Sequence, residues 1–502
     1  MKFNSLAKKD GTLYNIIKER KCPVYIDRLQ GGSHIDEYEY DEDLLSTYRE
    51  MLVENFWVFQ MHEWLSNYKG DLSKLTELDK NKWTKENIEK LIFKKFPTPC
   101  LFLECMTAEE MAQAGKPENV QDFCKNMMEI YRKRIKTHGE LIPCDSYFLA
   151  YAFEIENGAK RIMPEVGAQT PDTRVQICYA RGMAQAHGIS FGTYYEPWGG
   201  SPFSACCYQK DDKNEWGIGD SEDFPFHTDG PNGGSSRSLQ ERIFIYSYMS
   251  GAEFISEEWG VCNVFTDWKN FELSPYGKVK KDFMEFTRKY RNVGKKITPI
   301  AAVLPKELVV LDDIRSPRTF CGYEISGKDG DMIEKAKNGV REIFSNEAEM
   351  IGTEKRNLIN SLIPDAVDLL NDTADEALEK YDYLVDLTSD IHFKEKHKNF
   401  CTPDEIPSLL REILPCYVEG GLHWMVNECT DGGYYLTIFN NSGVVRSVKD
   451  GEYTLREADK TVDVFFKNNR EPEVCEGKAT LKKNENIYEL TVRAGDWCLI
   501  KF

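Results

Sequence analysis

Carboxylate residues end three short, β-prone runs in this chain, and aromatic residues lie beside two of them. Glu165 ends "RIMPE", Glu196 ends "ISFGTYYE", and Glu257 and Glu258 end "GAEFISEE". Two carboxylates placed on either side of an anomeric carbon are the groups that hydrolyse a glycosidic bond. Burial beside aromatic rings keeps one of them protonated near neutral pH. The pattern therefore predicts a two-carboxylate site for a sugar derivative.

The doublet at the end of the third run predicts two different roles. Neighbouring residues of a strand point to opposite faces, so only one of Glu257 and Glu258 can face the site. Glu258 adjoins Trp259, and we expect it to face the sugar while Glu257 supports it. We predict Glu165 as the acid/base residue and either Glu258 or Glu196 as the nucleophile.

Other polar and aromatic residues follow predicted strands or lie in the loop 198–237, which is rich in Gly, Pro, Ser and aromatic residues. Long loops in compact barrels are usually binding loops or lids. Arg237 could instead cap a helix or pair on the surface. The predicted substrate-binding residues are Asp27, Arg28, His62, Glu104, Asp145, Tyr194, Tyr195, Trp198, His227, Arg237, Glu257 and Trp259.

A metal site is the competing interpretation of four of these residues, Asp27, His62, Glu104 and Asp145, which would converge in a metal-dependent barrel hydrolase. The chain has eight His residues and no His-x-His on an early strand. We therefore predict no metal and no cofactor. A serine nucleophile is disfavoured because no Gly-x-Ser-x-Gly motif is present.

The elements that must position these residues alternate between strand and helix from Cys22 to about residue 292. Repeating βα units favour parallel strands, and their number favours a closed (β/α)8 TIM barrel over residues 1–297, with its site at the carboxyl ends of the strands. The expected strands are 23–28, 56–61, 100–105, 140–144, 161–166, 189–195 and 252–257, and the expected helices are 41–55, 119–139, 171–188, 238–251 and 274–290.

The pattern changes after residue 297. A strand at 297–305, helical stretches and a strand–helix–strand segment at 361–389 predict a small α/β domain over 298–415. Short alternating strands separated by Gly, Asn and Asp predict an all-β, sandwich-like domain over 416–502.

Composition narrows the class of protein. The 502 residues carry a formal charge of −19, which argues against a nucleic-acid or anionic-membrane partner. The first residues lack the apolar core of a signal peptide, and no apolar run reaches the roughly 18 residues of a membrane span. Fifteen cysteines without zinc-type spacing are typical of reduced thiols, so we expect a cytoplasmic protein.

The order of domains resembles the family 42 β-galactosidases and related barrel glycosidases. "HGISFGTYYEPWGG" resembles the nucleophile strand of that family, at Glu196, and "DLLNDTADEALEKYDYLVDL" resembles its glutamine-amidotransferase-like middle domain. The resemblance implies a retaining glycosidase with a carbohydrate substrate and self-association. In that family the acid/base Glu follows an Asn on the fourth strand, whereas here Glu104 or Glu165 would fill that role without an Asn-Glu pair.

Two questions remain open from the sequence: which residue is the nucleophile, and to which class of protein the chain belongs. If residues 297–305 form the eighth barrel strand, Glu258 follows the seventh; if they open the middle domain, Glu196 follows the seventh and is the nucleophile. The missing Asn-Glu pair also fits a non-catalytic carbohydrate-binding barrel, and a metal-dependent barrel isomerase or lyase is the third class considered.

Overall fold

The computed structural model forms two compact units, one of residues 1–163 with 309–331 and the other of residues 164–308 with 332–502. We call them the first and the second unit and describe each by itself. The structure describes residues 8–26, 42–62, 75–92, 108–145, 151–167, 173–196, 209–210, 216–217, 236–257, 264–265, 270–306, 319–320, 323–325, 327–344, 358–372, 375–447, 451–485 and 487–502.

The first unit contains parallel strands in the order β1 (Val24–Ile26), β2 (Phe56–His62) and β3 (Leu141–Asp145), followed by the start of β4 (Arg161–Gly167). These strands lie where the sequence predicts them. Helices of this unit are α2 (Thr12–Arg20), α3 (Glu42–Leu52), α5 (Lys85–Ile92), α6 (Ala108–Ala114), α7 (Val120–His138) and α8 (Tyr151–Glu156), with the short turns η1 (Val53–Asn55) and η2 (Lys80–Lys82) and the hairpin β11 (Thr319–Phe320) and β12 (Tyr323–Glu324).

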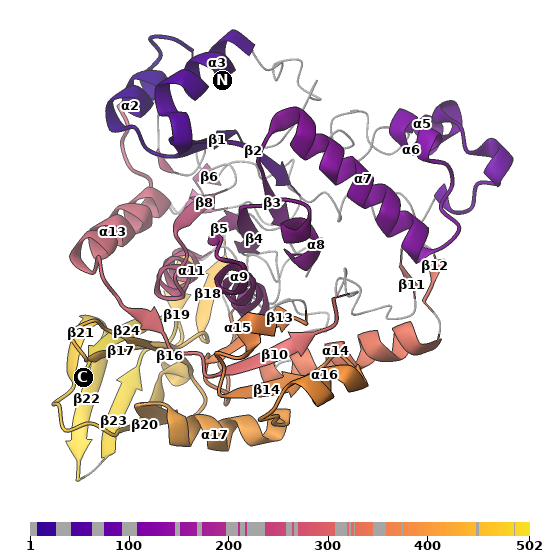
Figure 1. Cartoon of the computed structure of the whole chain (residues 1–502). Helices are drawn as coiled ribbons and strands as arrows, with labels where there is room; N and C mark the ends of the chain where they lie inside the picture. Colours follow the sequence, from indigo (N-terminus) through magenta and orange to yellow (C-terminus); the bar gives the residue numbers. More distant parts are fainter. Residues whose placement is uncertain are drawn as a thin grey trace. The chain divides into compact units, whose positions relative to one another are not determined.

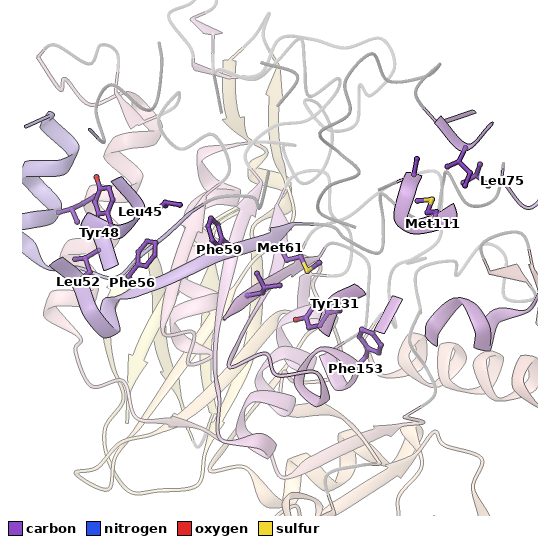
Figure 2. Close-up of a cluster of buried hydrophobic side chains, with 14 of the residues drawn as sticks. Leu45, Tyr48, Leu52, Phe56, Phe59, Met61, Leu75, Met111, Tyr131 and Phe153 are labelled. Atoms are coloured by element: carbon purple, nitrogen blue, oxygen red, sulfur yellow. The ribbon is translucent and has the colours of Figure 1, made fainter. Parts of the chain in front are cut away.

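An apolar cluster holds the first unit together. Figure 2 shows Phe56, Phe59 and Met61 of β2 among side chains from the helices, including Tyr48 of α3 and Tyr131 of α7. All of them are buried. Burial of apolar area of this kind is the dominant favourable contribution to folding.

The second unit contains the rest of β4, then β5 (Ser190–Glu196) and β8 (Phe254–Glu257), which pair in parallel with Tyr195 opposite Glu257. Helices α9 (Thr173–His187), α11 (Arg237–Met249) and α13 (Pro275–Lys289) lie where their periodicity predicts them (Figure 1). Ser236 and Ser274 cap α11 and α13, each accepting a hydrogen bond 2.9 Å long from a backbone N–H in the first turn. The short pair β6 (Gln209–Lys210) and β7 (Trp216–Gly217) also belongs to this unit.

The prediction of a closed eight-stranded barrel over residues 1–297 is wrong in part, because the parallel strands form an open sheet. Over the residues that the structure describes, the parallel strands follow an open order, β1-β2-β3-β4-β5-β8. The predicted strand 100–105 lies outside the described residues. The candidate eighth strand, β10 (Ile300–Leu304), has β13 on one edge and β14 on the other, so it belongs to another sheet. The fold is a mixed α/β structure with an open parallel sheet.

That other sheet is parallel, in the order β13 (Val367–Asn371), β10 and β14 (Tyr383–Asp386). Gly182 lets α9 pack closely against β13, because a Cβ atom at this position would lie 2.2 Å from the carbonyl oxygen of Leu369. The neighbouring helices are α14 (Gly327–Phe344), α15 (Asp375–Leu378), α16 (Ile391–Lys396), η4 (Pro403–Glu405) and α17 (Ile406–Ile413).

The C-terminal segment forms antiparallel sheets, as its alternating pattern predicts (Figure 1). One sheet has the order β21-β24-β17-β16-β9, another β15-β20-β23-β22, and β18 pairs with β19. The strands are β9 (Lys295–Lys296), β15 (Cys416–Glu419), β16 (His423–Glu428), β17 (Tyr434–Phe439), β18 (Val444–Ser447), β19 (Gly451–Thr454), β20 (Lys460–Phe466), β21 (Glu473–Gly477), β22 (Ala479–Asn484), β23 (Ile487–Val492) and β24 (Trp497–Lys501), with the turn η5 (Arg456–Ala458) before β20.

A buried group of charged and polar side chains joins several elements of the second unit. Asp365, just before β13, lies 2.8 Å from Lys296 Nζ of β9 and 3.2 Å from His423 Nε2 of β16. Arg181 of α9 donates to Asp368 over 2.6 Å and lies 3.8 Å from Asp365. We call Arg174, Arg181, Lys296, Asp365, Asp368 and His423 the buried ionic cluster. Removing one partner from such a group leaves an uncompensated charge, so the cluster fixes how these elements pack.

The cluster predicts that the second unit loses stability in mild acid. Burial lowers the pKa of His423 to about 4, so the folded protein holds this ring neutral. An unfolded chain protonates its histidines near pH 6.5. Lowering the pH from about 6.5 to 4 therefore favours the unfolded state, by about 3 kcal/mol for this residue. Urea unfolding across that range measures the loss.

The matched variants are His423→Asn and His392→Asn, because His392 is an exposed histidine on α16 of the same unit. His423→Asn flattens the dependence of unfolding free energy on pH between 6.5 and 4, whereas His392→Asn leaves it as in the wild type. Equal pH dependence in all three proteins would contradict the assignment.

Candidate active site at the strand ends

Glu165 and Glu196 lie at the carboxyl ends of neighbouring strands of the second unit. Their exposed fractions are 2% and 5%. The ends of β4 and β5 touch at Gly167, where a Cβ atom would lie 2.1 Å from the carbonyl oxygen of Glu196. Gly167 has a φ of +155°, a conformation that favours glycine. This close approach places the residues Glu165 and Glu196 at one edge of the sheet.

The side chains of β5 divide between two faces. The ring of Tyr195 packs edge-on against Phe244 of α11, with 5.4 Å between ring centroids. Tyr195 therefore faces the helices, and burial raises its pKa well above the ordinary value. By strand alternation Tyr194 and Glu196 point to the opposite face of the sheet. Tyr194 is fully buried there.

Glu257 of β8 lies on the same face as Tyr195, because the two residues are directly opposite in the parallel pair. Its carboxylate forms an ion pair with Lys280 of α13 and accepts a hydrogen bond from Gln240 Nε2 of α11 over 3.4 Å. Burial lowers the pKa of Lys280, while the negative charge of Glu257 raises it. Two helices therefore hold the carboxyl end of β8 through one carboxylate.

Arg237, the first residue of α11, is held by Glu452 of β19. The carboxylate of Glu452 accepts hydrogen bonds from the backbone N–H groups of Arg237 and Ser238, over 2.9 and 3.1 Å, and from Arg237 Nε over 3.1 Å. A carboxylate at a helix N-terminus satisfies free N–H groups and complements the helix dipole. The predicted contact between Arg237 and substrate stays a prediction.

The other predicted site residues are distributed as follows. His62 and Asp145 are the last residues of β2 and β3 in the first unit, and His62 pairs in register with Cys144. The side chains of His62 and Asp145 are not among those that the structure describes. The structure places Glu165, Tyr194, Tyr195, Glu196 and Glu257 on strands β4, β5 and β8 of the second unit, with Tyr195 and Glu257 on the helix face and Tyr194 and Glu196 on the opposite face. The residues that fall outside the described ranges are Asp27, Arg28, Glu104, Trp198, His227, Glu258 and Trp259.

Lys280, the ion-pair partner of Glu257, is the residue that the sequence analysis missed. It lies four residues after Tyr276 and three before Phe283 on α13, within the stripe that packs against α11. The ring of Phe283 lies 5.3 Å from that of Phe244. A lysine inside an apolar stripe needs a buried anion, and that signal could have identified it.

Over the described part of the chain, no group of three or more His, Cys, Asp or Glu side chains is placed to hold a metal ion. Within those same residues, no helix combines the length and apolar character needed to cross a membrane.

No protein-family model and no curated protein sequence matches the chain. Among solved structures, it is similar to the catalytic module of a family 98 glycoside hydrolase from Streptococcus pneumoniae, crystallised with the LewisY pentasaccharide blood group antigen. The likeness covers 92% of this chain and 88% of that chain, with 10% sequence identity and a TM-score of 0.37. At that TM-score the likeness supports no conclusion about activity, and the resemblance to family 42 stays a prediction.

The ion pair between Glu257 and Lys280 predicts a strong effect of a single substitution. Lys280→Met leaves a buried carboxylate without its cation, and losses of about 3–5 kcal/mol follow such changes. Lys281→Met is the matched control, because Lys281 is exposed one position later and pairs with the exposed Glu285. Urea unfolding should show a lower midpoint for Lys280→Met and the wild-type midpoint for Lys281→Met. Equal midpoints for both variants would overturn the role given to Lys280.

Proposed function

We propose that this protein is a glycoside hydrolase that works through strand-end carboxylates of the second unit. The observation that carries the proposal is that Glu165 and Glu196 are both buried at the touching ends of β4 and β5. Burial of carboxyl groups costs free energy, and active sites are where such groups are retained. A pair of carboxyl groups is the minimum machinery for hydrolysis of a glycosidic bond.

Glu165 is proposed as the acid/base residue and Glu196 or Glu258 as the nucleophile. We propose that Glu165 lies on the same face of the sheet as Glu196. Neighbouring strands lie about 4.8 Å apart, which is close to the separation of about 5–5.5 Å between the two carboxyl groups of retaining enzymes. This supports a retaining mechanism. Glu258 stays a candidate on the sequence alone, as the carboxylate next to Trp259.

In the proposed reaction, the nucleophile attacks the anomeric carbon while Glu165 protonates the departing oxygen. A glycosyl-enzyme ester forms and the glycosidic bond breaks. Glu165 then removes a proton from water, which attacks the anomeric carbon and releases the nucleophile as a carboxylate. Tyr194, on the same face of β5 as Glu196, and the sequence neighbours Trp198 and Trp259 are proposed to shape the sugar site of an exo-acting enzyme.

The proposal is tested with Glu165→Gln, Glu196→Gln and Glu258→Gln assayed on a panel of nitrophenyl glycosides. We expect the wild type to cleave at least one substrate. Glu165→Gln should lower kcat/KM about 10²–10⁴-fold on substrates with poor leaving groups and less on dinitrophenyl glycosides, which need no acid. The variant of the true nucleophile should lose turnover on both kinds of substrate.

Glu253→Gln is the matched control, because Glu253 is an exposed carboxylate just before β8. It should keep wild-type activity. Near-full turnover in all three site variants would show that these carboxylates are not the catalytic ones. A sugar that raises the Tm of the wild type and is never cleaved would instead favour the non-catalytic carbohydrate-binding protein.

A further inference from the structure

The connection from β8 to α13 is fastened to the first turn of α13. Ser274, the N-cap residue of α13, donates its backbone N–H to the carbonyl oxygen of Val264 over 3.0 Å. Gly277 permits the close approach of this carbonyl group, because a Cβ atom at residue 277 would lie 2.1 Å from the same oxygen. We call the described residues of the connection, 264–265 and 270–274, the rim segment.

The contacts of two helices place the rim segment at the carboxyl edge of the parallel sheet. Lys280 in the second turn of α13 and Gln240 in the first turn of α11 both contact the carboxylate of Glu257, the last residue of β8. At the other ends of these helices, Tyr248 donates a hydrogen bond 2.6 Å long to the carbonyl oxygen of Tyr290. Both helices therefore begin at the carboxyl edge of β8, and the residues directly before α13 lie there too. Ligands of parallel α/β sheets bind at this edge.

Phe271 of the rim segment combines a strained backbone with an exposed ring. Its φ of +55° lies in the left-handed region, which is unfavourable for a bulky side chain and which Gly and Asn adopt more readily. The side chain exposes 38% of its area. Its ring packs edge-on against Phe265, with 5.3 Å between the ring centroids, and Phe265 pairs with Leu273 in an antiparallel bridge. A strained residue that presents an apolar ring to solvent opposes folding, and such residues are typical of binding sites.

Exposed aromatic rings are few in the part of the chain that the structure describes. Among the side chains described there, Phe271 and Tyr453 are the aromatic residues with a large exposed fraction. Tyr453 of β19 follows Glu452, whose carboxylate reaches the first turn of α11, so strand alternation turns Tyr453 away from that helix. Within the described residues, Phe271 is therefore the exposed aromatic ring at the carboxyl edge of the parallel sheet.

We propose that Phe271 is a platform for a sugar ring that is not itself hydrolysed, so that the substrate is an oligosaccharide. The CH faces of a pyranose ring are apolar and pack on an aromatic ring, while its hydroxyl groups stay in water. Strand β8 is next to β5, so the edge continues from Glu165 and Glu196 to the rim segment. An oligosaccharide held at the two carboxylates extends along this edge onto Phe271. The platform rests on the sugar substrate proposed above and adds a second subsite to it.

The test measures binding of the full chain to an array of printed di- to hexasaccharides. All proteins carry Glu165→Gln, so that the glycans stay intact, and the protein with this change alone is the reference. We expect the reference to bind a set of these oligosaccharides. Adding Phe271→Asn should weaken that binding about tenfold or more, because an aromatic contact is lost. Phe271→Trp, which keeps a platform, should retain it, and the matched control Tyr453→Asn should bind like the reference.

The Tm separates a platform from a packing residue. Asn tolerates the left-handed backbone, so Phe271→Asn should keep or raise the Tm of the reference. A Tm lowered by about 3 °C or more would show that the ring holds the fold, and would overturn the proposal. Unchanged binding by Phe271→Asn, or a reference that binds none of the oligosaccharides, would overturn it as well. If the wild type cleaves no nitrophenyl glycoside, the hydrolase is contradicted, whereas oligosaccharide binding that depends on Phe271 still supports the platform.

Discussion

The carboxylate of Asp365 is the interaction around which the second unit is organised. It is fully buried, and cationic or donor groups reach it from the strands β9 and β16 and from the helix α9. A charge in the interior is tolerated only with its partners in place, so the positions of these elements are tied to one another. Burial opposes ionisation of Asp365, but the neighbouring cations hold its pKa well below the ordinary value.

The need of a buried charge for a compensating partner also separates the carboxylates of the parallel strands into two groups. Glu257 is turned toward α11 and α13, where Lys280 compensates its charge. Glu196 lies on the other face of the sheet, away from that cation, because it is one residue after Tyr195 on β5. Alternation along an extended chain thus places the structural carboxylate Glu257 on the helix side and leaves Glu196, which is proposed for chemistry, on the opposite side.

The local elements were accessible to prediction because their signals are local. Apolar spacing defined α7, α9, α11 and α13, and Ser-Pro at 274–275 marked the start of the last of them. The closure of the sheet was not accessible in this way. The run "IAAVL" at 300–304 is apolar enough for any buried parallel strand, and only its pairing with residues 367–371 and 383–386 shows which sheet it joins. The partners of Asp365 are similarly distant in sequence, and no periodicity reports a contact between residues 181 and 365. The strand ends that carry Glu165 and Glu196 were predicted from the sequence. Lys280 was missed because its ion-pair partner, Glu257, was predicted to bind the substrate.

The helix that follows the candidate site is held by residues that come more than two hundred positions later in the sequence. Glu452 caps the N-terminus of α11, and Trp497 donates a hydrogen bond 3.0 Å long to Glu241 of the same helix. Residues 237 and 241 of α11 are synthesised more than two hundred residues before their partners Glu452 and Trp497. The second unit can reach its final packing only after residues 452 and 497 have been synthesised, so the nascent chain must keep the apolar faces of α11 and β5 from other partners until then.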